Sequence, residues 1–430
     1  MLNWDNPLST QLTDIEKTSA EPQTLAGSYA NSDVLAGMSF DGSSLEKKGV
    51  TLPEAQKVND ASDFFVDVGD DDASVNPVAD AALKGIEIDQ AEAQDSLAPI
   101  KASDKCVING EADVNQLAPF KYPWAWEYFL NANKNHWTPL DINMAQDVQD
   151  YQHNLNDAEK HVYENVLAYL TTSDILAMRN IGLAVMEKMT APELQIYQAR
   201  QVYEEALHTW TYQHCIETIG LDQGEIYNRY RVVPAIHGKI KLANKRLDSV
   251  MRSDMDLRDP KNLNDFVMAY IFFAAIFEGS WFYNGFTPIF SLQRRGLMKG
   301  TAEQLQYIMR DEVMHASFGI RVVKQIMLEN NVTLDPKAIR DMWDESEAAE
   351  HAYAHYILKK PILGYSAEDH IEQFRFIANR RARQLGLEEP YPNAQNRTPW
   401  LDEQANMKKE KNFFETRVTE YQTGGALDWG

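Results

Sequence analysis

The sequence predicts an all-α fold, and three observations support this class. Between about residues 118 and 386 the apolar residues recur three and four positions apart, which is the period of an amphipathic helix. Interruptions in this pattern carry helix start and stop signals such as Pro192 and Gly220. No stretch shows the convincing alternation of apolar and polar residues that predicts a β-strand, and no Asn-Gly turn joins two such stretches as in a β-hairpin. We therefore expect a bundle of long helices.

The N-terminal residues differ from this helical part in composition. Residues 1–110 contain no arginine and many Asp, Glu, Ser and Ala residues, and segments such as VDVGDDDASVNPVADAA lack a sustained period. A chain with high charge and little apolar content cannot bury enough surface to fold. We expect residues 1–110 to form a disordered acidic extension, to which we assign no activity.

Helical patterns fill the predicted domain, residues 111–386. Its packed part is expected to start at APFKYPWAWEYFL, where aromatic residues return. The first long helix starts at DAEKHVYENVL, with Asp157 as its N-cap and Lys160 where a capping box would place Glu. A second helix runs from Pro192 to Gly220. Further helices are expected at about residues 223–255, 262–296, 301–329, 335–359 and 366–386.

The last segment, residues 387–430, mixes Pro, Asn, Gly and charged residues, which predicts an irregular and mobile tail. Tyr421 and Trp429 lie near its end. Aromatic residues are unusual in a solvated terminus, so these two could contact a partner.

Charge and cysteine content limit the partners and the compartment. The 430 residues include 41 Lys and Arg against 64 Asp and Glu, a net charge of -23. Nucleic acids and anionic membrane surfaces require positive charge, so neither is expected as a partner. The opening MLNWDNPLST lacks the basic and apolar segments of a secretory signal, which favours a cytoplasmic location. Cys106 and Cys215 are too few for a disulfide framework and are expected to be free thiols.

One apolar run, VMAYIFFAAIFEGSWFYNGF, is about as long as a membrane span and carries a single charge, Glu278. A membrane helix and a buried bundle helix both fit this pattern. The acidic remainder of the chain and the lack of flanking basic loops favour the buried helix.

Two helical segments repeat the spacing Glu-x-x-His. EEALH contains Glu205 and His208, and RDEVMH contains Glu312 and His315. Residues three apart on a helix lie about 60° from one another, so each pair projects to one side and can bind one metal ion. A single pair of this kind is more typical of a solvated helix face.

A further carboxylate precedes each pair at a similar distance. Asp174 lies 31 residues before Glu205, and Glu278 lies 34 residues before Glu312. An unpaired Glu278 in its apolar run would be costly to bury or would take up a proton, so a cation partner is expected. The sequence therefore predicts six metal ligands on four helices: Asp174, Glu205, His208, Glu278, Glu312 and His315.

This ligand set is typical of ferritin-like di-iron and di-manganese proteins, where four carboxylates balance the charge of two divalent ions. Mixed carboxylate and imidazole ligands favour iron or manganese over zinc, calcium or magnesium, and the sequence does not separate the two metals. Tyr212 lies four residues after His208, on nearly the same side of the helix. It is either a core tyrosine or a residue that the metal pair oxidises by one electron.

With these motifs in view, the sequence from about Ala118 to the C-terminus closely resembles the radical-generating small subunit of class I ribonucleotide reductase. The resemblance rests on TTSD with Asp174, EEALH followed by Tyr212, WFY after Glu278, and RDEVMH. It implies a ferritin-like bundle, a homodimer, and a dinuclear iron or manganese centre that reacts with O2. Tyr212 would carry the radical, since its presence disfavours the subclass with phenylalanine at this position.

The same resemblance implies roles for residues outside the ligand set. Residues at the positions that shield the radical are Phe282, Phe286 and Ile308. Trp137 and Asp311 match the residues that relay electrons to the metal-bound histidine, and a carboxylate at Asp311 would also fix the tautomer of that imidazole. The C-terminal tail would dock on the large catalytic subunit, and Tyr421 would pass the radical to it for the reduction of ribonucleotides to deoxyribonucleotides.

Two other functions share these ligands. A di-iron oxygenase or oxidase would act on an organic substrate and would not need Trp137, Asp311 or the aromatic tail. An iron-storage protein would bind many irons per chain in a shell-forming oligomer, and such chains are usually much shorter.

Overall fold

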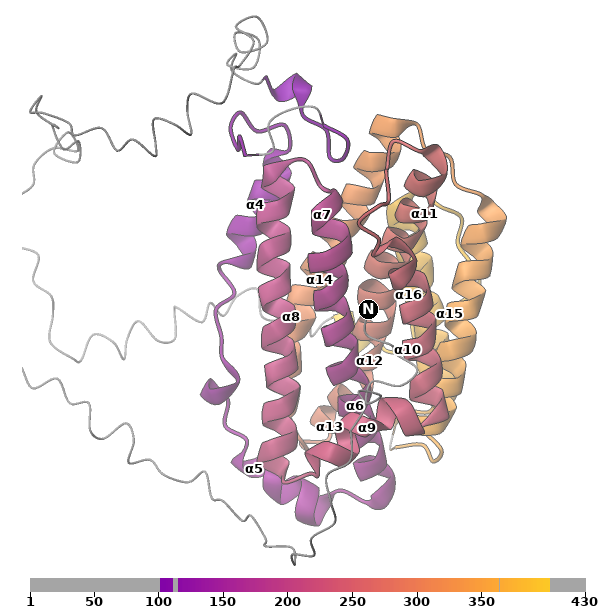
Figure 1. Cartoon of the computed structure of the whole chain (residues 1–430). Coiled ribbons are helices and arrows are strands. Elements are labelled where there is room, and N and C mark those ends of the chain that lie inside the picture. Colours follow the sequence, from indigo (N-terminus) through magenta and orange to yellow (C-terminus); the bar gives the residue numbers. More distant parts are fainter. Residues whose placement is uncertain (1–100, 111–114, 363, 403–430) are drawn as a thin grey trace, which may run out of the picture. The chain divides into compact units, whose positions relative to one another are not determined.

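The structure, a computed structural model, describes residues 101–110, 115–362 and 364–402 (Figure 1). In this part of the chain it consists of helices and connecting loops, with no β-strand beyond one isolated bridge between Ile362 and Tyr365. The prediction of an all-α bundle is confirmed. The expected disordered extension, apart from its last residues, lies outside the described residues, as do Tyr421 and Trp429.

The helices follow one another in this order: η2 (Ala102–Asp104), α4 (Pro123–Ala132), η3 (Pro139–Asp141), α5 (Ala145–Gln149), η4 (Asp150–Asn154), α6 (Asp157–Asn180), η5 (Ile181–Val185), α7 (Met186–Lys188), α8 (Pro192–Ile219), α9 (Gln223–Val232), α10 (Pro234–Leu247), η6 (Asp248–Val250), α11 (Pro260–Ile271), η7 (Phe272–Phe282), α12 (Tyr283–Gly285), α13 (Thr287–Arg294), α14 (Lys299–Asn330), α15 (Pro336–Ile357) and α16 (Ala367–Leu385). Helix α8 packs against α4 and α6 (Figure 1), and η7 packs against α14 and α16.

The start of α6 differs by one residue from the sequence prediction. Asn156, not Asp157, is the N-cap, because its side-chain oxygen accepts hydrogen bonds from the backbone N–H of Ala158 (3.0 Å) and Glu159 (3.1 Å). The Glu159 carboxylate in turn accepts from the backbone N–H of Asn156 at 3.0 Å. The capping box therefore exists, one position earlier than expected.

The other helix boundaries follow proline and glycine. Helix α8 has the predicted extent and ends at Gly220, whose φ of 82° is the left-handed conformation that glycine adopts most easily. The single helix expected at residues 223–255 is instead divided into α9 and α10. Pro234 forces the preceding Val233 into an extended conformation, with φ of -96° and ψ of 110°, and so ends α9.

The packed part of the chain extends past both boundaries expected from composition. Val107 and Ile108 are buried on the N-terminal side, and Thr398 and Leu401 are buried on the C-terminal side. Residues 101–110 and 387–402, which composition assigned to the extension and the tail, therefore pack on the bundle.

The apolar run lies in a continuous helical stretch, Pro260–Arg294, that includes η7. By length and composition this stretch could cross a membrane, but 94% of its most apolar window is buried inside the bundle. Burial of this kind is typical of the core helix of a globular protein. Part of the run, η7, has the wider π-helical turn, which is rare and often found at functional sites.

Candidate metal centre

Four helices bring the six predicted ligands together in the core. Asp174 lies on α6, Glu205 and His208 lie on α8, Glu278 lies on η7, and Glu312 and His315 lie on α14. Each of these side chains is at most 1% exposed. The Glu-x-x-His pairs thus face each other from α8 and α14, and a single carboxylate from α6 or η7 joins each end.

One half of the centre surrounds the imidazole of His208. Its Nδ1 lies 4.0 Å from Asp174 Oδ2, 3.6 Å from Glu205 Oε2 and 3.1 Å from Glu312 Oε1. Ligand atoms of Asp174, Glu205 and His208 all lie within 4.8 Å of one another, close enough to hold one metal ion.

The other half surrounds the imidazole of His315. Its Nδ1 lies 3.1 Å from Glu205 Oε1, 3.9 Å from Glu278 Oε1 and 3.6 Å from Glu312 Oε2. The two oxygens of Glu205 therefore face different imidazoles, and so do those of Glu312. The two imidazole ring centroids are 6.0 Å apart, so Glu205 and Glu312 lie between them and would be available to both ions of a dinuclear centre.

Burial and mutual charge shift the pKa values of these groups in opposite directions. Burial, together with the charge of Glu205, raises the pKa of Asp174 and of Glu278 well above the ordinary range. Burial also opposes ionisation of Glu205, yet the two imidazoles lower its pKa to about 2. The imidazoles of His208 and His315 have raised pKa values, because the surrounding carboxylates outweigh the effect of burial.

The centre contains a concentration of buried polar atoms that form no hydrogen bond within the described residues. These atoms are Asp174 Oδ1 and Oδ2, Glu205 Oε1 and Oε2, Glu278 Oε2, Glu312 Oε1 and Oε2, His208 Nδ1 and His315 Nδ1. Buried groups of this kind normally have partners, and their absence is costly. Two divalent cations fit the donor set, since they would satisfy these atoms and balance four carboxylates.

Asp311 occupies the position expected from the sequence, but its predicted link to Trp137 is not direct. The Nε2–H of His208 donates to Asp311 Oδ2 at 3.1 Å, and the Asn135 amide donates to Asp311 Oδ1 at 2.5 Å. The indole N–H of Trp137 forms no hydrogen bond with a described residue. Trp137 instead stacks on Tyr307, with 5.2 Å between ring centroids and 17° between planes.

A second carboxylate outside the ligand set was missed by the sequence prediction. The Nε2–H of His315 donates to Glu204 Oε2 at 2.8 Å, and Arg200 Nε donates to Glu204 Oε1 at 2.9 Å. The available signal was its position, because Glu204 immediately precedes Glu205 as Asp311 immediately precedes Glu312. Gln201 was missed as well, and its amide donates to Glu278 Oε1 at 2.8 Å.

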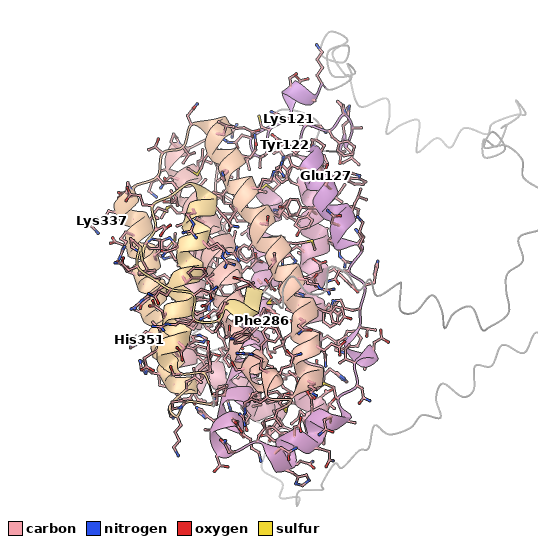
Figure 2. All side chains as sticks on the ribbon, turned by 180° about the vertical axis from the view of Figure 1, so that it is seen from behind. Lys121, Tyr122, Glu127, Phe286, Lys337 and His351 are labelled. Atoms are coloured by element: carbon pink, nitrogen blue, oxygen red, sulfur yellow. The ribbon has the colours of Figure 1, made fainter. Side chains whose placement is uncertain are left out.

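Tyr212 lies fully buried beside the centre, and its hydroxyl forms no hydrogen bond with a described residue. Burial raises its pKa well above the ordinary value, and the negative charges of Asp174 and Glu312 raise it further. The three predicted shielding residues, Phe282, Phe286 and Ile308, are also fully buried. Figure 2 shows Phe286 near the middle of the bundle, away from exposed residues such as Lys337 at its edge.

The bundle and its buried set of four carboxylates and two imidazoles define a ferritin-like protein with a candidate dinuclear metal site. Residues 114–399 match the sequence family described as "Ribonucleotide reductase, small chain". The chain is 37% identical to the ribonucleoside-diphosphate reductase subunit beta of Chlamydia pneumoniae, over 77% of this chain and 96% of that protein.

Two solved structures share the fold. One is the ribonucleotide reductase R2 subunit from Clostridium botulinum, with a TM-score of 0.64, 23% identity, and coverage of 70% of this chain and 94% of that one. The other is the dimanganese(II) protein NrdF of Streptococcus sanguinis, with a TM-score of 0.54, 18% identity, and coverage of 68% and 97%. The chain belongs to the small-subunit family of class I ribonucleotide reductase. These oxidoreductase subunits generate a radical and work with a large subunit.

Proposed function

We propose that Asp174, Glu205, His208, Glu278, Glu312 and His315 bind two iron ions, or two manganese ions, in each chain. The observation that carries this proposal is the convergence of their unpaired buried atoms on one place in the core. When bound, the ions would use O2 to supply a one-electron oxidant. The rest of the chemistry depends on the protein residues around them.

Tyr212 is the residue that we propose to be oxidised. Oxidation removes one electron from the ring and one proton from the hydroxyl, so a proton acceptor must be close. The carboxylate of Asp174 is suited to this role, since it is close enough for its charge to act on the Tyr212 hydroxyl. Phe282, Phe286 and Ile308 would exclude water from the ring, because all three are apolar and fully buried.

The oxidising equivalent then needs a route to the large catalytic subunit, where ribonucleotides are reduced to deoxyribonucleotides. Asp311 is hydrogen-bonded to the His208 imidazole and marks the inner end of the route. We propose Trp137 as the next residue, although its indole N–H forms no direct hydrogen bond with Asp311, whose Oδ1 accepts from the Asn135 amide instead. Tyr421 would be the last residue on this chain, and the C-terminal tail would dock on the large subunit.

We further propose that two copies of the chain form a homodimer in the cytoplasm. Tyr203 and Trp210 are 54% and 42% exposed and lie seven residues apart on α8, so they share one face. Both α6 and η5 pack beside α8. Ile175 on α6 is 40% exposed, and Leu183 on η5 is 58% exposed. Exposed apolar side chains gathered on neighbouring helices are typical of a protein interface.

The test is electron paramagnetic resonance of the chain after anaerobic loading with ferrous iron and exposure to air. We expect a tyrosyl signal, about two irons per chain, and loss of the signal in Tyr212→Phe. Full iron loading without a signal, repeated with manganese, would contradict the role of Tyr212. Many irons per chain would indicate storage, and oxidation of an organic substrate by a chain truncated after Phe414 would indicate an oxygenase.

A further inference from the structure

Lys239 on α10 is fully buried inside the bundle, where its ammonium group lies among three aromatic rings. Its Nζ is 3.9 Å from the ring centroid of Tyr169, 4.5 Å from that of Tyr353 and 4.7 Å from that of Trp281. All three rings are themselves fully buried. This cation and its rings lie outside the set of residues that bind the metals or carry the radical.

A network of buried polar groups holds the ammonium group in place. Lys239 Nζ donates to Glu350 Oε2 at 2.5 Å. Glu350 Oε1 is also paired with His370 Nε2 at 2.6 Å and with the Asn284 amide at 3.1 Å. A buried ion pair is costly to form and is often no more stabilising than apolar residues of the same size. The presence of a charged Lys239 inside the bundle is therefore not explained by a contribution to stability.

The rings over Lys239 are close to the candidate metal centre. Trp281 follows Glu278 by three residues in η7, and Tyr169 precedes Asp174 by five residues in α6. The charge of Asp174 acts on the hydroxyl of Tyr169 as it does on that of Tyr212. Tyr169 also makes an edge contact with Phe282, with 6.5 Å between ring centroids. A strong oxidant at the centre thus has several oxidisable side chains within the same core.

We propose that Lys239 protects Tyr169, Trp281 and Tyr353 from oxidation and so confines the radical to Tyr212. A cation is attracted to the electron-rich face of an aromatic ring. Removing an electron from that ring abolishes the attraction and leaves an electron-poor ring against a positive charge. Oxidation of these rings is therefore disfavoured while Lys239 is charged.

Tyr212 differs from these rings in lacking such a cation, although carboxylate charges act on the hydroxyls of both Tyr212 and Tyr169. No Lys or Arg lies over its ring among the described residues, and the charges that act on it most strongly are those of Asp174 and Glu312. A negative environment favours loss of an electron, and a carboxylate can take the proton. The inference rests on the proposed oxidation of Tyr212, and it explains how one tyrosine is selected among several.

Replacement of Lys239 by methionine removes the charge and keeps an unbranched apolar side chain. In Lys239→Met, Glu350 still has His370 and Asn284 as hydrogen-bonding partners. Tyr169 would then lose one electron to the loaded, O2-treated centre, while its O–H bond breaks and the proton moves to the Glu350 carboxylate. No reactant beyond those of the proposed function is needed.

The test compares the iron-loaded, air-exposed full chain with Lys239→Met and Lys239→Arg by electron paramagnetic resonance. Ring-deuterated tyrosine or tryptophan assigns each signal, and peptide mass spectrometry locates oxidised side chains. In Lys239→Met we expect the ratio of other radicals to the Tyr212 radical to rise about tenfold. The new signal should disappear when Tyr169→Phe or Trp281→Phe is added. Lys239→Arg, which keeps the charge, should resemble the unmodified chain.

An unchanged Tyr212 radical in a correctly folded Lys239→Met chain, with no oxidation of the three rings, would overturn the inference and leave the proposed function intact. Absence of a tyrosyl signal in the unmodified chain would instead contradict the proposed function. The mass spectra would still show whether Lys239 protects the three rings from oxidation. If Lys239→Met does not fold, Lys239→Gln, which also removes the charge but keeps a hydrogen-bond donor for Glu350, replaces it, with the same two outcomes.

Discussion

Glu204 accepts a hydrogen bond from His315 Nε2 at 2.8 Å, although Glu204 lies on α8 and His315 on α14. The reverse pairing also occurs, since Asp311 on α14 accepts from His208 Nε2 on α8 at 3.1 Å. A carboxylate accepts here, so each Nε2 carries a proton, and each Nδ1 faces the centre, where it would bind a metal ion after losing its own proton. The two helices therefore orient each other's imidazoles.

Replacing Glu204 should weaken metal binding on the His315 side of the centre. Glu204→Leu removes the acceptor and leaves the imidazole free to change its tautomer, so we expect metal affinity to fall by about 10- to 100-fold. Glu204→Gln keeps an oxygen acceptor and should lose less. Metal titration by calorimetry measures both, and Glu217→Gln, a change at an exposed glutamate on the same helix, is the control. Equal affinities for Glu204→Leu and the control would refute the orienting role.

The six candidate ligands can be named from the sequence, whereas the groups that would orient them cannot. Each Glu-x-x-His pair is local, because three residues along one helix already fix the side of projection. The pairing of Glu204 with His315 joins two helices and depends on how α8 and α14 pack. Asp311 could be assigned only through the resemblance to known small subunits, and the contact of Asn135 with Asp311 depends on a loop that has no periodic pattern.

The fold shows the same division between local and non-local information. The run of long helices follows from apolar periodicity, and the end of α8 follows from Gly220. The break at Val233 could be expected from Pro234, but the apolar pattern continues across it and hides the break. Burial of Val107 and Leu401 depends on contacts with distant helices, such as the hydrogen bond from Val107 N–H to Glu329 at 3.0 Å.

Gly319 allows α14 and η7 to approach each other closely beside the centre. It lies one turn after His315, and a Cβ at this position would come within 2.5 Å of the Cβ of Ala274, one turn before Glu278. We expect Gly319→Ala to destabilise the fold by about 1–3 kcal/mol, because the helices must move apart. Gly238→Ala on α10 is the matched control, since nothing lies within 4 Å of its Cβ position.

Chemical denaturation measures both glycine variants. Gly238→Ala should stabilise the protein by about 0.5–1 kcal/mol, as expected for alanine in place of glycine inside a helix. A Gly319→Ala chain as stable as the Gly238→Ala chain would show that α14 and η7 accommodate the added methyl group without moving apart. Metal content should fall only in Gly319→Ala, because Glu278 and His315 lie on the displaced segments.

Metal binding should release protons, and metal affinity should therefore rise with pH. The pKa values of Asp174 and Glu278 are raised mainly by burial, so these groups are protonated in the metal-free protein and must ionise to bind a cation. The stability of the metal-free fold should change with pH in the opposite direction and fall as the pH rises. Their neutral forms stabilise the metal-free fold at low pH, and this contribution is lost as the pH rises through the raised pKa values.

Proton release can be measured with a pH indicator in weakly buffered solution during addition of anaerobic ferrous iron. Asp174→Asn should release about one proton fewer than the unmodified chain. In thermal unfolding, the metal-free form should lose stability as the pH rises. This loss should be smaller in Asp174→Asn. Metal affinity independent of pH between about 5 and 8 would show that Asp174 and Glu278 are already ionised without metal.

The side chain of Asp402 fixes the end of the described chain to the bundle. Arg380 donates from Nη1 to Oδ1 at 2.9 Å and from Nη2 to Oδ2 at 2.7 Å, and the Tyr283 hydroxyl donates to Oδ1 at 2.9 Å. Tyr421 lies 19 residues further along the chain. If the C-terminal residues dock on the large subunit, this anchor sets the point from which they start.

We expect Asp402→Ala to weaken binding of the large subunit by about two- to tenfold, because more chain must be ordered on binding. The Tyr212 radical should be unchanged, since Asp402 lies outside the centre. The free energy of unfolding should fall by about 1 kcal/mol. Surface plasmon resonance with the large subunit measures the affinity, and Asp265→Ala, which removes an exposed pair with Lys261, is the control. Equal affinities for the two variants would mean that docking does not depend on where the tail leaves the bundle.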